Sequence, residues 1–497
     1  MILIPLLVFL VGLLLTSLWA ERHTKTTSFT LQYFVGERTL NGFVLAMTLV
    51  ATYGSVSSFV SGPGIAWNLG LGWVVFAAPQ VIAGFLLLGV AGKKLALVGR
   101  VTGAVTVIDI IRARYGNRRV GRSLAVLLAL LMLLFFTTMM VGQFIGGAQI
   151  FAKAAHIDYP WALLLFGVLT VAYTGLGGFR VVAFTDMICA LFMMAGMVLL
   201  GGYVLDMGGG LTAIMAKLAT MTPRPGTEPG VLLDPFAGGA LSFPLLLSAW
   251  VLVGFGTLGL PQSAVRALSY RTSADLHQAM WISTVVCGAL MIGMTLLGVL
   301  IRGVMDVPVA QLGSTDAMMP TFIAQHMPPW VAGVMLIGPL AATMSTVSSL
   351  LLAASSAIIK DLLLVWRPEW ETQSARGLTY FTKGFTTLLG VVALLLALFP
   401  LDVIAWINLF AFGGLELAFL LPLIGGLFWS RATAWGALTS VLGSLVVYLS
   451  ISVFKIPVGG FHAIVPAMLV AFALYVGVSL LGRPEAAPAF FASTKRD

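Results

Sequence analysis

Hydroxyl-bearing and helix-weakening residues interrupt a long apolar stretch at residues 42–71, where residues 48–64 read TLVATYGSVSSFVSGPG. The stretch is long enough to cross a bilayer as a helix. In hydrocarbon, however, an unpaired backbone carbonyl costs several kcal/mol, so a broken helix is tolerated only where the freed groups face protein, water or a ligand. We therefore predict an ion or substrate site at this break.

A second hydroxyl cluster, LAATMSTVSS at residues 340–349, contains the adjacent pair Ser345 and Thr346. A hard monovalent cation such as Na⁺ prefers about five or six oxygen ligands, and neutral hydroxyls with freed carbonyls supply them without excess negative charge. Because the two residues are adjacent, both reach one ion only where their helix meets exposed carbonyls, which the break described above would offer. The alternative is that both hydroxyls donate to carbonyls one turn earlier or mediate helix packing.

The composition indicates an all-α polytopic membrane protein. Of the 497 residues, 59% are hydrophobic and 9% are charged, and the mean hydropathy is +1.03. A soluble globular chain carries a charged fraction near a quarter. The net charge of +9 forms no basic patch, so a nucleic-acid partner is not expected.

Apolar segments of spanning length recur along the whole chain, and they predict thirteen transmembrane helices within one transporter domain. They fall at about residues 1–20, 42–70, 72–92, 120–151, 160–176, 180–205, 239–262, 276–302, 328–358, 378–399, 402–428, 432–454 and 460–482.

The basic residues between these segments predict how the chain lies in the membrane. Lys and Arg accumulate on the cytoplasmic side. With the N-terminus outside and the C-terminus in the cytoplasm, all but five of the 27 Lys and Arg residues lie inside. We therefore expect a multi-pass protein of the cell (inner) membrane in this orientation. The five on the outer side are Lys153, Lys217, Arg224, Arg302 and Lys455.

The spacing of two interrupted spans suggests an inverted repeat. The second span breaks at residues 52–64, and five spans later the seventh, SFPLLLSAWVLVGFGTLGLPQ, is interrupted by three glycines and Pro261. Broken spans at matching positions of two halves point to the central site of a secondary transporter. Five spans per half is an odd number, so the halves insert in opposite orientations. The predicted division is 42–205 and 239–428 for the two repeats, with 1–41 and 432–482 peripheral.

Glu416 lies in FGGLELAF within the eleventh predicted span. A carboxylate there costs a few kcal/mol or more, so it should be protonated, paired or functional. We predict a role in coupling, behind the ligands themselves. The alternative is a neutral side chain that is hydrogen-bonded to a neighbouring helix.

Four motifs occur along the chain: the stretch at 51–58, YTGLGGFRVVAFTD at 173–186, ATMST at 342–346 and GLFWSRATAWGALTS at 426–440. Together they resemble the sodium:solute symporter family, whose members have thirteen spans and a leucine-transporter-type inverted-repeat core. The resemblance covers nearly the whole chain and implies one Na⁺ held by the hydroxyls of Ser345 and Thr346 and the carbonyls of Ala342, Ala51 and Gly54.

The same resemblance implies that Asp186 assists the passage of Na⁺ near the inner side. On physical grounds, Asp186 could equally be a helix-end residue that pairs with Arg180. Position 53 is Tyr, where the proline-transporting members of the family resemble one another in having Asp. This difference argues against a proline carrier.

Within the family, the region at 43–74, QFIGGA at 143–148, PQSAVRALSY at 261–270 and NLFAFGGLELAF at 408–419 are most similar to the sodium/pantothenate symporters. The implied solute is pantothenate, a small anion with a carboxylate, an amide and two hydroxyls. No Lys or Arg is expected at mid-membrane, so Na⁺ and helix dipoles would neutralise this anion. Candidate solute-binding residues are Ser55, Ser57, Ser58, Gln143, Thr257 and Gln262.

The sequence as a whole predicts a secondary active transporter that imports a small carboxylated solute with Na⁺ by alternating access. Another small solute, such as a monocarboxylate, proline or a sugar, is the alternative. An enzyme is not expected, because no cluster of acids or histidines lies at an interface and no P-loop or Rossmann fingerprint occurs. We expect Na⁺ as coupling ion, no organic cofactor and no obligate protein partner beyond the lipid bilayer.

Overall fold

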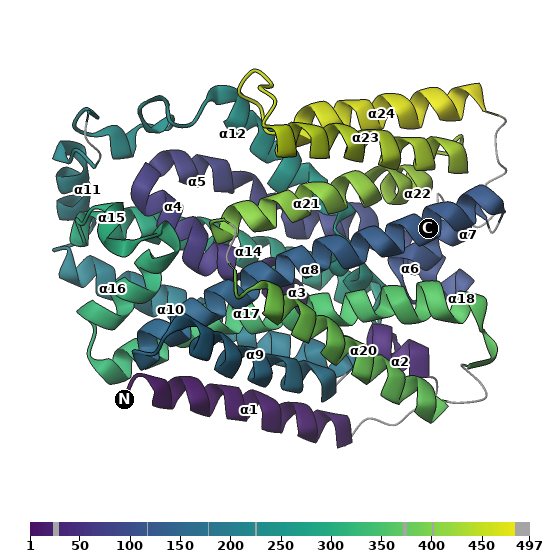
Figure 1. The fold of residues 1–497 in the computed structure, drawn as a ribbon, viewed down its shortest axis with the longest axis horizontal. Helices are drawn as coiled ribbons and strands as arrows, with labels where there is room; N and C mark the ends of the chain where they lie inside the picture. Colours follow the sequence, from purple (N-terminus) through teal and green to yellow (C-terminus); the bar gives the residue numbers. More distant parts are fainter. Residues whose placement is uncertain are drawn as a thin grey trace.

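The chain folds into a bundle of helices that run mainly along the long axis of the molecule, as the computed structural model shows (Figure 1). Within the residues that the structure describes, all regular elements are helical, which agrees with the predicted all-α class. The described residues are 1–22, 29–116, 118–176, 178–223, 226–370, 375–399 and 402–482.

Helices occur where the apolar pattern predicts spans. In the first predicted repeat they are α3 (Gly42–Tyr53), α4 (Gly62–Leu69), α5 (Leu71–Ala77), α6 (Lys93–Thr102), α8 (Arg119–Ala155), α9 (Tyr159–Leu176) and α10 (Phe179–Met207). In the second they are α12 (Phe243–Ala249), α13 (Pro261–Ala264), α14 (Ser273–Val304), α17 (Pro329–Ser356), α20 (Ala375–Leu396) and α21 (Ile404–Leu420). The helices outside the predicted repeats are α1 (Leu3–Arg22), α23 (Ala434–Phe454) and α24 (Ile464–Leu481).

In the described residues, nine helices are long and apolar enough to cross a membrane, and eleven spans result if each of two bent pairs counts as one. The two further spans predicted from sequence coincide with α1 and α9, which are apolar but shorter. The number thirteen and the division into repeats therefore remain predictions.

Both predicted breaks are present. The chain bends by 67° between Gly42–Tyr53 and Ser57–Leu69, and by 48° between Phe243–Gly259 and Pro261–Leu268. Gly54 ends α3 with φ −74° and ψ 108°, which is extended backbone. Leu260 is extended as well, because the ring of a following proline disfavours the helical region. Local residue chemistry thus accounts for both bends.

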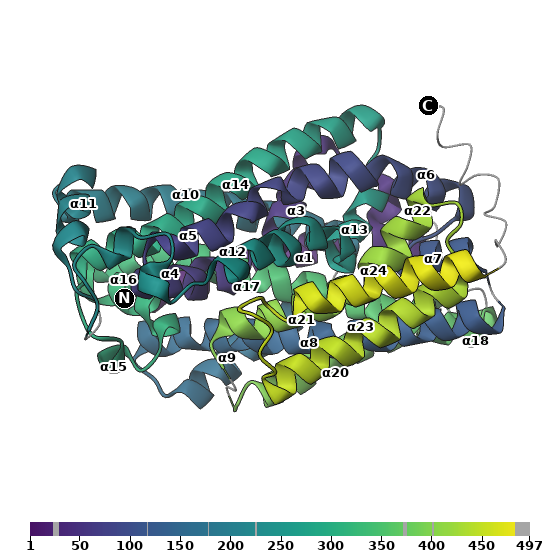
Figure 2. The same cartoon turned by 90° about the horizontal axis from the view of Figure 1, so that it is seen from above.

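Opposite ends of the bundle carry different short helices, and Figure 2 shows the same separation from a second direction. One end holds α11 (Leu211–Thr220), α15 (Val309–Leu312) and α16 (Met318–His326). The other end holds α2 (Phe29–Val35), α6, α7 (Val107–Tyr115) and α18 (Leu364–Trp366). The broken segments lie between the two ends.

Close backbone contacts hold the half-helix that follows the first break. A methyl group at Gly298 of α14 would lie 2.1 Å from the carbonyl oxygen of Pro63, and one at Gly64 would lie 2.1 Å from that of Thr315. Backbone atoms cannot turn away as a flexible side chain can. The position of α4 therefore depends on glycine at these contacts.

We predict that Gly298→Ala lowers the free energy of unfolding by about 1–3 kcal/mol or more, because the added methyl group overpacks the contact. The thermal unfolding midpoint of the purified protein in detergent measures this effect. Gly202→Ala is the control, since a methyl group there meets no atom within 4 Å. Equal midpoints for the two variants would contradict the prediction.

Candidate ion and solute site

Five oxygen atoms from α3 and α17 converge at the first break. Ser345 Oγ lies 2.9 Å from the carbonyl oxygen of Ala51, and Thr346 Oγ1 lies 3.4 Å from that of Gly54. The same two hydroxyls lie 3.2 Å and 2.9 Å from the carbonyl oxygen of Ala342. The five residues implied by the family resemblance therefore meet in one place, and all are buried.

The chemistry of this cluster suits a hard monovalent cation. Its two hydroxyls now donate to carbonyls, but each oxygen keeps lone pairs, and a hydroxyl hydrogen rotates freely. A cation between the five neutral oxygens would accept all of them as ligands without burying excess negative charge. The contacts with Ala342 also match the alternative considered from sequence, in which the hydroxyls bond back to their own helix.

The predicted solute residues divide into two groups. Ser55, Ser57 and Ser58 line a cavity beside the break, with about 70 Å³ available to the centre of a water-sized sphere. Gln143 and Thr257 instead support the two breaks: Gln143 Oε1 accepts a 3.0 Å hydrogen bond from the Val56 amide, and Thr257 donates one of 2.6 Å to the Gly254 carbonyl.

Gln262, the last of the predicted solute residues, is buried next to the second break. Its backbone carbonyl accepts a hydrogen bond from Arg266 Nη1. Gln143, Thr257 and Gln262 are not among the residues that line the solute cavity.

The same cavity is also lined by polar and aromatic side chains that the sequence analysis did not single out. Asn408 on α21 donates to Ser57 Oγ through Nδ2, while its Oδ1 has no protein partner in the described residues. The ring of Trp73 stacks on Phe76 with centroids 4.5 Å apart. A polar side chain inside an apolar span was the signal for Asn408 and for Gln80, which also lines the cavity.

Arg266 differs from its predicted location. The sequence placed it in an inner loop and considered Arg180 as the partner of Asp186, whereas the structure buries Arg266 to 2% exposure and pairs its Nη2 with Asp186 Oδ2 at 3.3 Å. Arg180 is exposed. The reason is the second break, because η9 (Val265–Leu268) follows it and carries Arg266 between the helices.

The prediction of Arg266 as an inner-loop residue is therefore wrong, because its guanidinium is buried between the helices. Arg266 Nη2 also donates to Ser349 Oγ at 2.6 Å, and its Nε donates to the Thr48 carbonyl at 3.3 Å. Thr48 Oγ1 donates to Asp186 Oδ2 at 2.7 Å. A buried ion pair needs such additional hydrogen bonds to offset its desolvation.

A hydroxyl contact joins this ion pair to the five-oxygen cluster. Thr52 Oγ1 lies 3.1 Å from Ser349 Oγ, and Thr52 is adjacent to Ala51. Asp186 is fully buried, and its second carboxylate oxygen has no protein partner in the described residues. The carboxylate therefore lies two hydrogen-bonded side chains away from the ion cluster.

Glu416 on α21 lies against the second break. It is 0% exposed, and neither carboxylate oxygen has a protein partner in the described part of the chain. A methyl group at Gly256 would lie 2.2 Å from Glu416 Oε2, so glycine is required for this contact. Among the described residues, Glu416 thus forms no hydrogen bond to a neighbouring helix, in contrast to the alternative considered from sequence.

Asp316 fastens the start of α21 to the half-helix after the first break. Its carboxylate accepts hydrogen bonds from Ser61 Oγ at 2.5 Å and from the Ile404 amide at 2.9 Å, and Ser61 Oγ accepts one from the Ala405 amide at 3.0 Å. Burial raises the pKa of Asp316 above its ordinary value. Ala405 also lines the cavity beside the first break, so this contact lies next to that cavity.

Comparison with known proteins assigns the fold and site to a class. The family model of the sodium:solute symporter family matches residues 33–443. The sodium/pantothenate symporter of Haemophilus influenzae is 40% identical over 485 residues, which are 97% of this chain and 96% of that protein. The sodium/pantothenate symporter of Escherichia coli K12 is 41% identical over 475 residues, 96% of this chain and 95% of that protein.

The fold also matches a solved transporter. The substrate-bound outward-open structure of a Na⁺-coupled sialic acid symporter aligns with a TM-score of 0.74 at 19% identity, over 97% of this chain and 98% of that one. The chain therefore belongs to the sodium:solute symporter family and has the leucine-transporter-type fold. It is a secondary transporter that couples Na⁺ to the movement of a small solute.

We predict that Arg266→Ala strongly lowers the thermal unfolding midpoint, because removing one partner of a buried ion pair costs about 3–5 kcal/mol. Adding Asp186→Ala should restore part of the loss, since the unpaired charge is then gone. Arg180→Ala is the control, because that side chain is exposed. A loss as large for Arg180→Ala would contradict the assigned pair.

Proposed function

We propose that this protein imports pantothenate together with Na⁺ across the inner membrane. The observation that carries the proposal is the convergence of five neutral oxygens at the end of α3, next to a cavity in which serines and Asn408 stand among apolar side chains. The solute is supported by two relatives that are named sodium/pantothenate symporters and are 40% and 41% identical over nearly the full chain.

The ion would be held by the carbonyls of Ala51, Gly54 and Ala342 and the hydroxyls of Ser345 and Thr346. These atoms belong to the end of α3 and the middle of α17, so bound Na⁺ joins the two helices. A ligand shifts a conformational equilibrium only by binding one state better. Na⁺ therefore favours the state in which α3 and α17 are in contact, and the solute must prefer the same state.

The solute would lie in the cavity lined by Ser55, Ser57, Ser58 and Asn408. The hydroxyls and the carboxamide provide donors and acceptors for the amide and hydroxyls of pantothenate, while Trp73 and neighbouring apolar side chains pack on its carbon chain. No Lys or Arg lines this cavity in the described residues. The charge of the solute carboxylate would therefore be balanced by Na⁺ and by the dipole of the half-helix that follows the break.

The roles that we propose for Asp186 and Glu416 follow from where their side chains lie. Asp186 would assist Na⁺ on its way inward, and Glu416 would couple the second break to α21. The N-terminus would lie outside and the C-terminus in the cytoplasm, with the two repeats divided as predicted from sequence. Neither an organic cofactor nor an enzymatic activity forms part of the proposal.

We predict that Thr346→Val and Ser345→Ala each raise the Na⁺ concentration for half-maximal uptake about tenfold to a hundredfold. Each variant removes one ligand of a charged group, a loss of about 1.5–3 kcal/mol. Uptake of labelled pantothenate into proteoliposomes at varied Na⁺ concentration measures this half-maximal concentration.

Thr343→Val is the matched control, since that hydroxyl donates at 2.9 Å to Pro339 of its own helix. Unchanged Na⁺ dependence in both site variants would overturn the ion site.

We predict that Asn408→Ala raises the KM for the solute about threefold to tenfold, the effect of losing one hydrogen bond of about 0.5–1.5 kcal/mol. The Na⁺ dependence at saturating solute should change little. Ser444→Ala on α23 is the control, because its hydroxyl contacts only Val441 of its own helix. If the KM of Asn408→Ala equals that of the control, Asn408 does not bind the solute.

Counterflow of labelled pantothenate in Na⁺-loaded proteoliposomes tests the solute itself. We expect exchange that competes with unlabelled pantothenate and not with proline, a sugar or a simple monocarboxylate. If one of those solutes supports Na⁺-dependent counterflow and pantothenate does not, pantothenate is the wrong solute within a correct class.

A further inference from the structure

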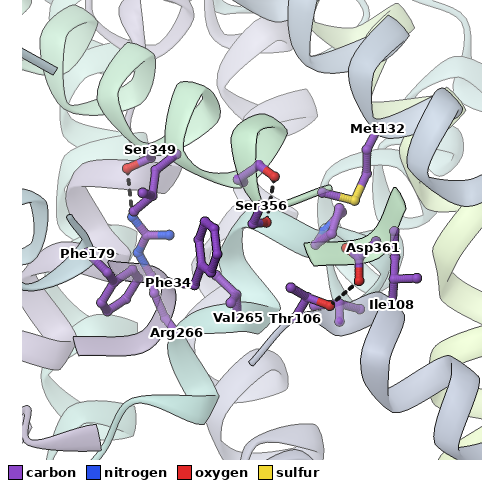
Figure 3. A pocket seen from close by; sticks show the side chains of 14 residues that line it. Phe34, Thr106, Ile108, Met132, Phe179, Val265, Arg266, Ser349, Ser356 and Asp361 are labelled. Atoms are coloured by element: carbon purple, nitrogen blue, oxygen red, sulfur yellow. Dashed lines mark hydrogen bonds between the residues drawn. The ribbon is translucent and has the colours of Figure 1, made fainter. Parts of the chain in front are cut away.

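A second cavity lies farther along α17, away from the solute cavity (Figure 3). About 20 Å³ of it is available to the centre of a water-sized sphere, which is room for one water or one small cation. Arg266 and Ser349 lie at one end of it, and Thr106 and Asp361 lie at the other. Ser349 is the residue that contacts Thr52 beside the ion cluster, so the cavity begins where that cluster ends.

Asp361 presents an unused charge to this cavity. It lies in η11 (Ala357–Leu363), is 1% exposed and accepts a 2.7 Å hydrogen bond from Thr106 Oγ1 through Oδ1. Its Oδ2 has no hydrogen-bond partner in the described residues. A buried carboxylate oxygen without a partner is costly unless a ligand, a proton or water satisfies it.

The neighbouring guanidinium does not satisfy that oxygen. Arg112 Nη2 donates at 3.0 Å to the backbone carbonyl of Asp361, and its Nη1 lies 3.4 Å from Asp109 Oδ1. Neither of these contacts involves the carboxylate of Asp361. The end of the cavity opposite Arg266 therefore combines a carboxylate with hydroxyls, which is the chemistry that a small hard cation requires.

We propose that Asp361, Thr106 and Ser356 form a transient second Na⁺ site, which the ion occupies between the cluster at Ser345 and release from the protein. The ligands are Asp361 Oδ2 and the two hydroxyls. The site rests on the proposed ion cluster, because α17 carries Ser345, Ser349, Ser356 and, in its continuation, Asp361. At 1.5 Å per residue, this path is about 24 Å long.

Charge explains why the ion would pause there. A cation that leaves five oxygens for a low-dielectric passage loses solvation, and one carboxylate restores much of it. Three ligands hold the ion more weakly than five, so release remains fast. The predicted orientation puts Asp361 toward the cytoplasm, where the ion must leave.

The test measures Na⁺ dependence separately on the two sides of the membrane. Right-side-out vesicles from cells that express the full chain are loaded with varied internal Na⁺, and uptake of labelled pantothenate is followed at fixed external Na⁺. Asp361→Asn should raise the internal Na⁺ concentration for half-inhibition about tenfold, the loss of one charged ligand. The external half-maximal concentration should stay within about twofold.

Ser356→Ala provides a milder variant, expected to raise the internal concentration about threefold. Ser355→Ala is its matched control, because the adjacent Ser355 hydroxyl contacts Thr386 at 2.6 Å and does not line the cavity. If Asp361→Asn does not reach the membrane, the comparison of Ser356→Ala with Ser355→Ala tests the proposed site.

Three outcomes overturn the proposal: unchanged internal dependence in Ser356→Ala and in any folded Asp361→Asn, equal changes on both sides, or equal effects of Ser355→Ala and Ser356→Ala. The ion cluster is judged independently by Thr346→Val and its external Na⁺ dependence. The two proposals can therefore fail separately.

Discussion

The structure depends on backbone carbonyls that are released inside an apolar bundle. Where α3 ends at Gly54, the carbonyls of Ala51 and Gly54 have no helical partner, and the surrounding side chains exclude water. An unpaired carbonyl in such surroundings costs several kcal/mol. The hydroxyls of Ser345 and Thr346 satisfy them, and so would a cation. This one requirement holds α3 against α17, and under the proposed ion site it would make the contact between them sensitive to Na⁺.

At the second break, the buried polar groups that find partners include charged side chains. Its extended residue Leu260 turns the chain, so that Arg266 reaches Asp186 and Ser349 between the helices, while Gly256 admits Glu416. Arg266 is a fixed cation beside the proposed mobile one, linked to it through Ser349 and Thr52. A chain of hydrogen bonds therefore links the residues that follow the second break to those beside the first. This linkage gives a physical basis for coupling between ion and solute.

The proposed solute and ion sites lie on different sides of the same broken helix. The carbonyls of α3 face α17, whereas the hydroxyls of the following turns face Asn408 on α21 and the aromatic cavity. Asp316 holds α21 to Ser61 beyond that cavity, and the cavity at Asp361 lies beyond the ion cluster along α17. Polar groups thus lie on both sides of the proposed ion and solute sites. A transporter that works by alternating access needs a polar path to each side of the membrane.

The sequence by itself determined the helices, both breaks and the residues that meet at the first break. Apolar run length decides a span, Gly54 and Pro261 act on their own backbone, and the proposed ion ligands are those that the family resemblance implies. Tertiary structure alone decided the partner of Asp186, the separation of Gln143, Thr257 and Gln262 from the solute cavity, and the free oxygen of Asp361. Those features depend on how helices far apart in the chain pack together, and neither periodicity nor composition records the contacts between them.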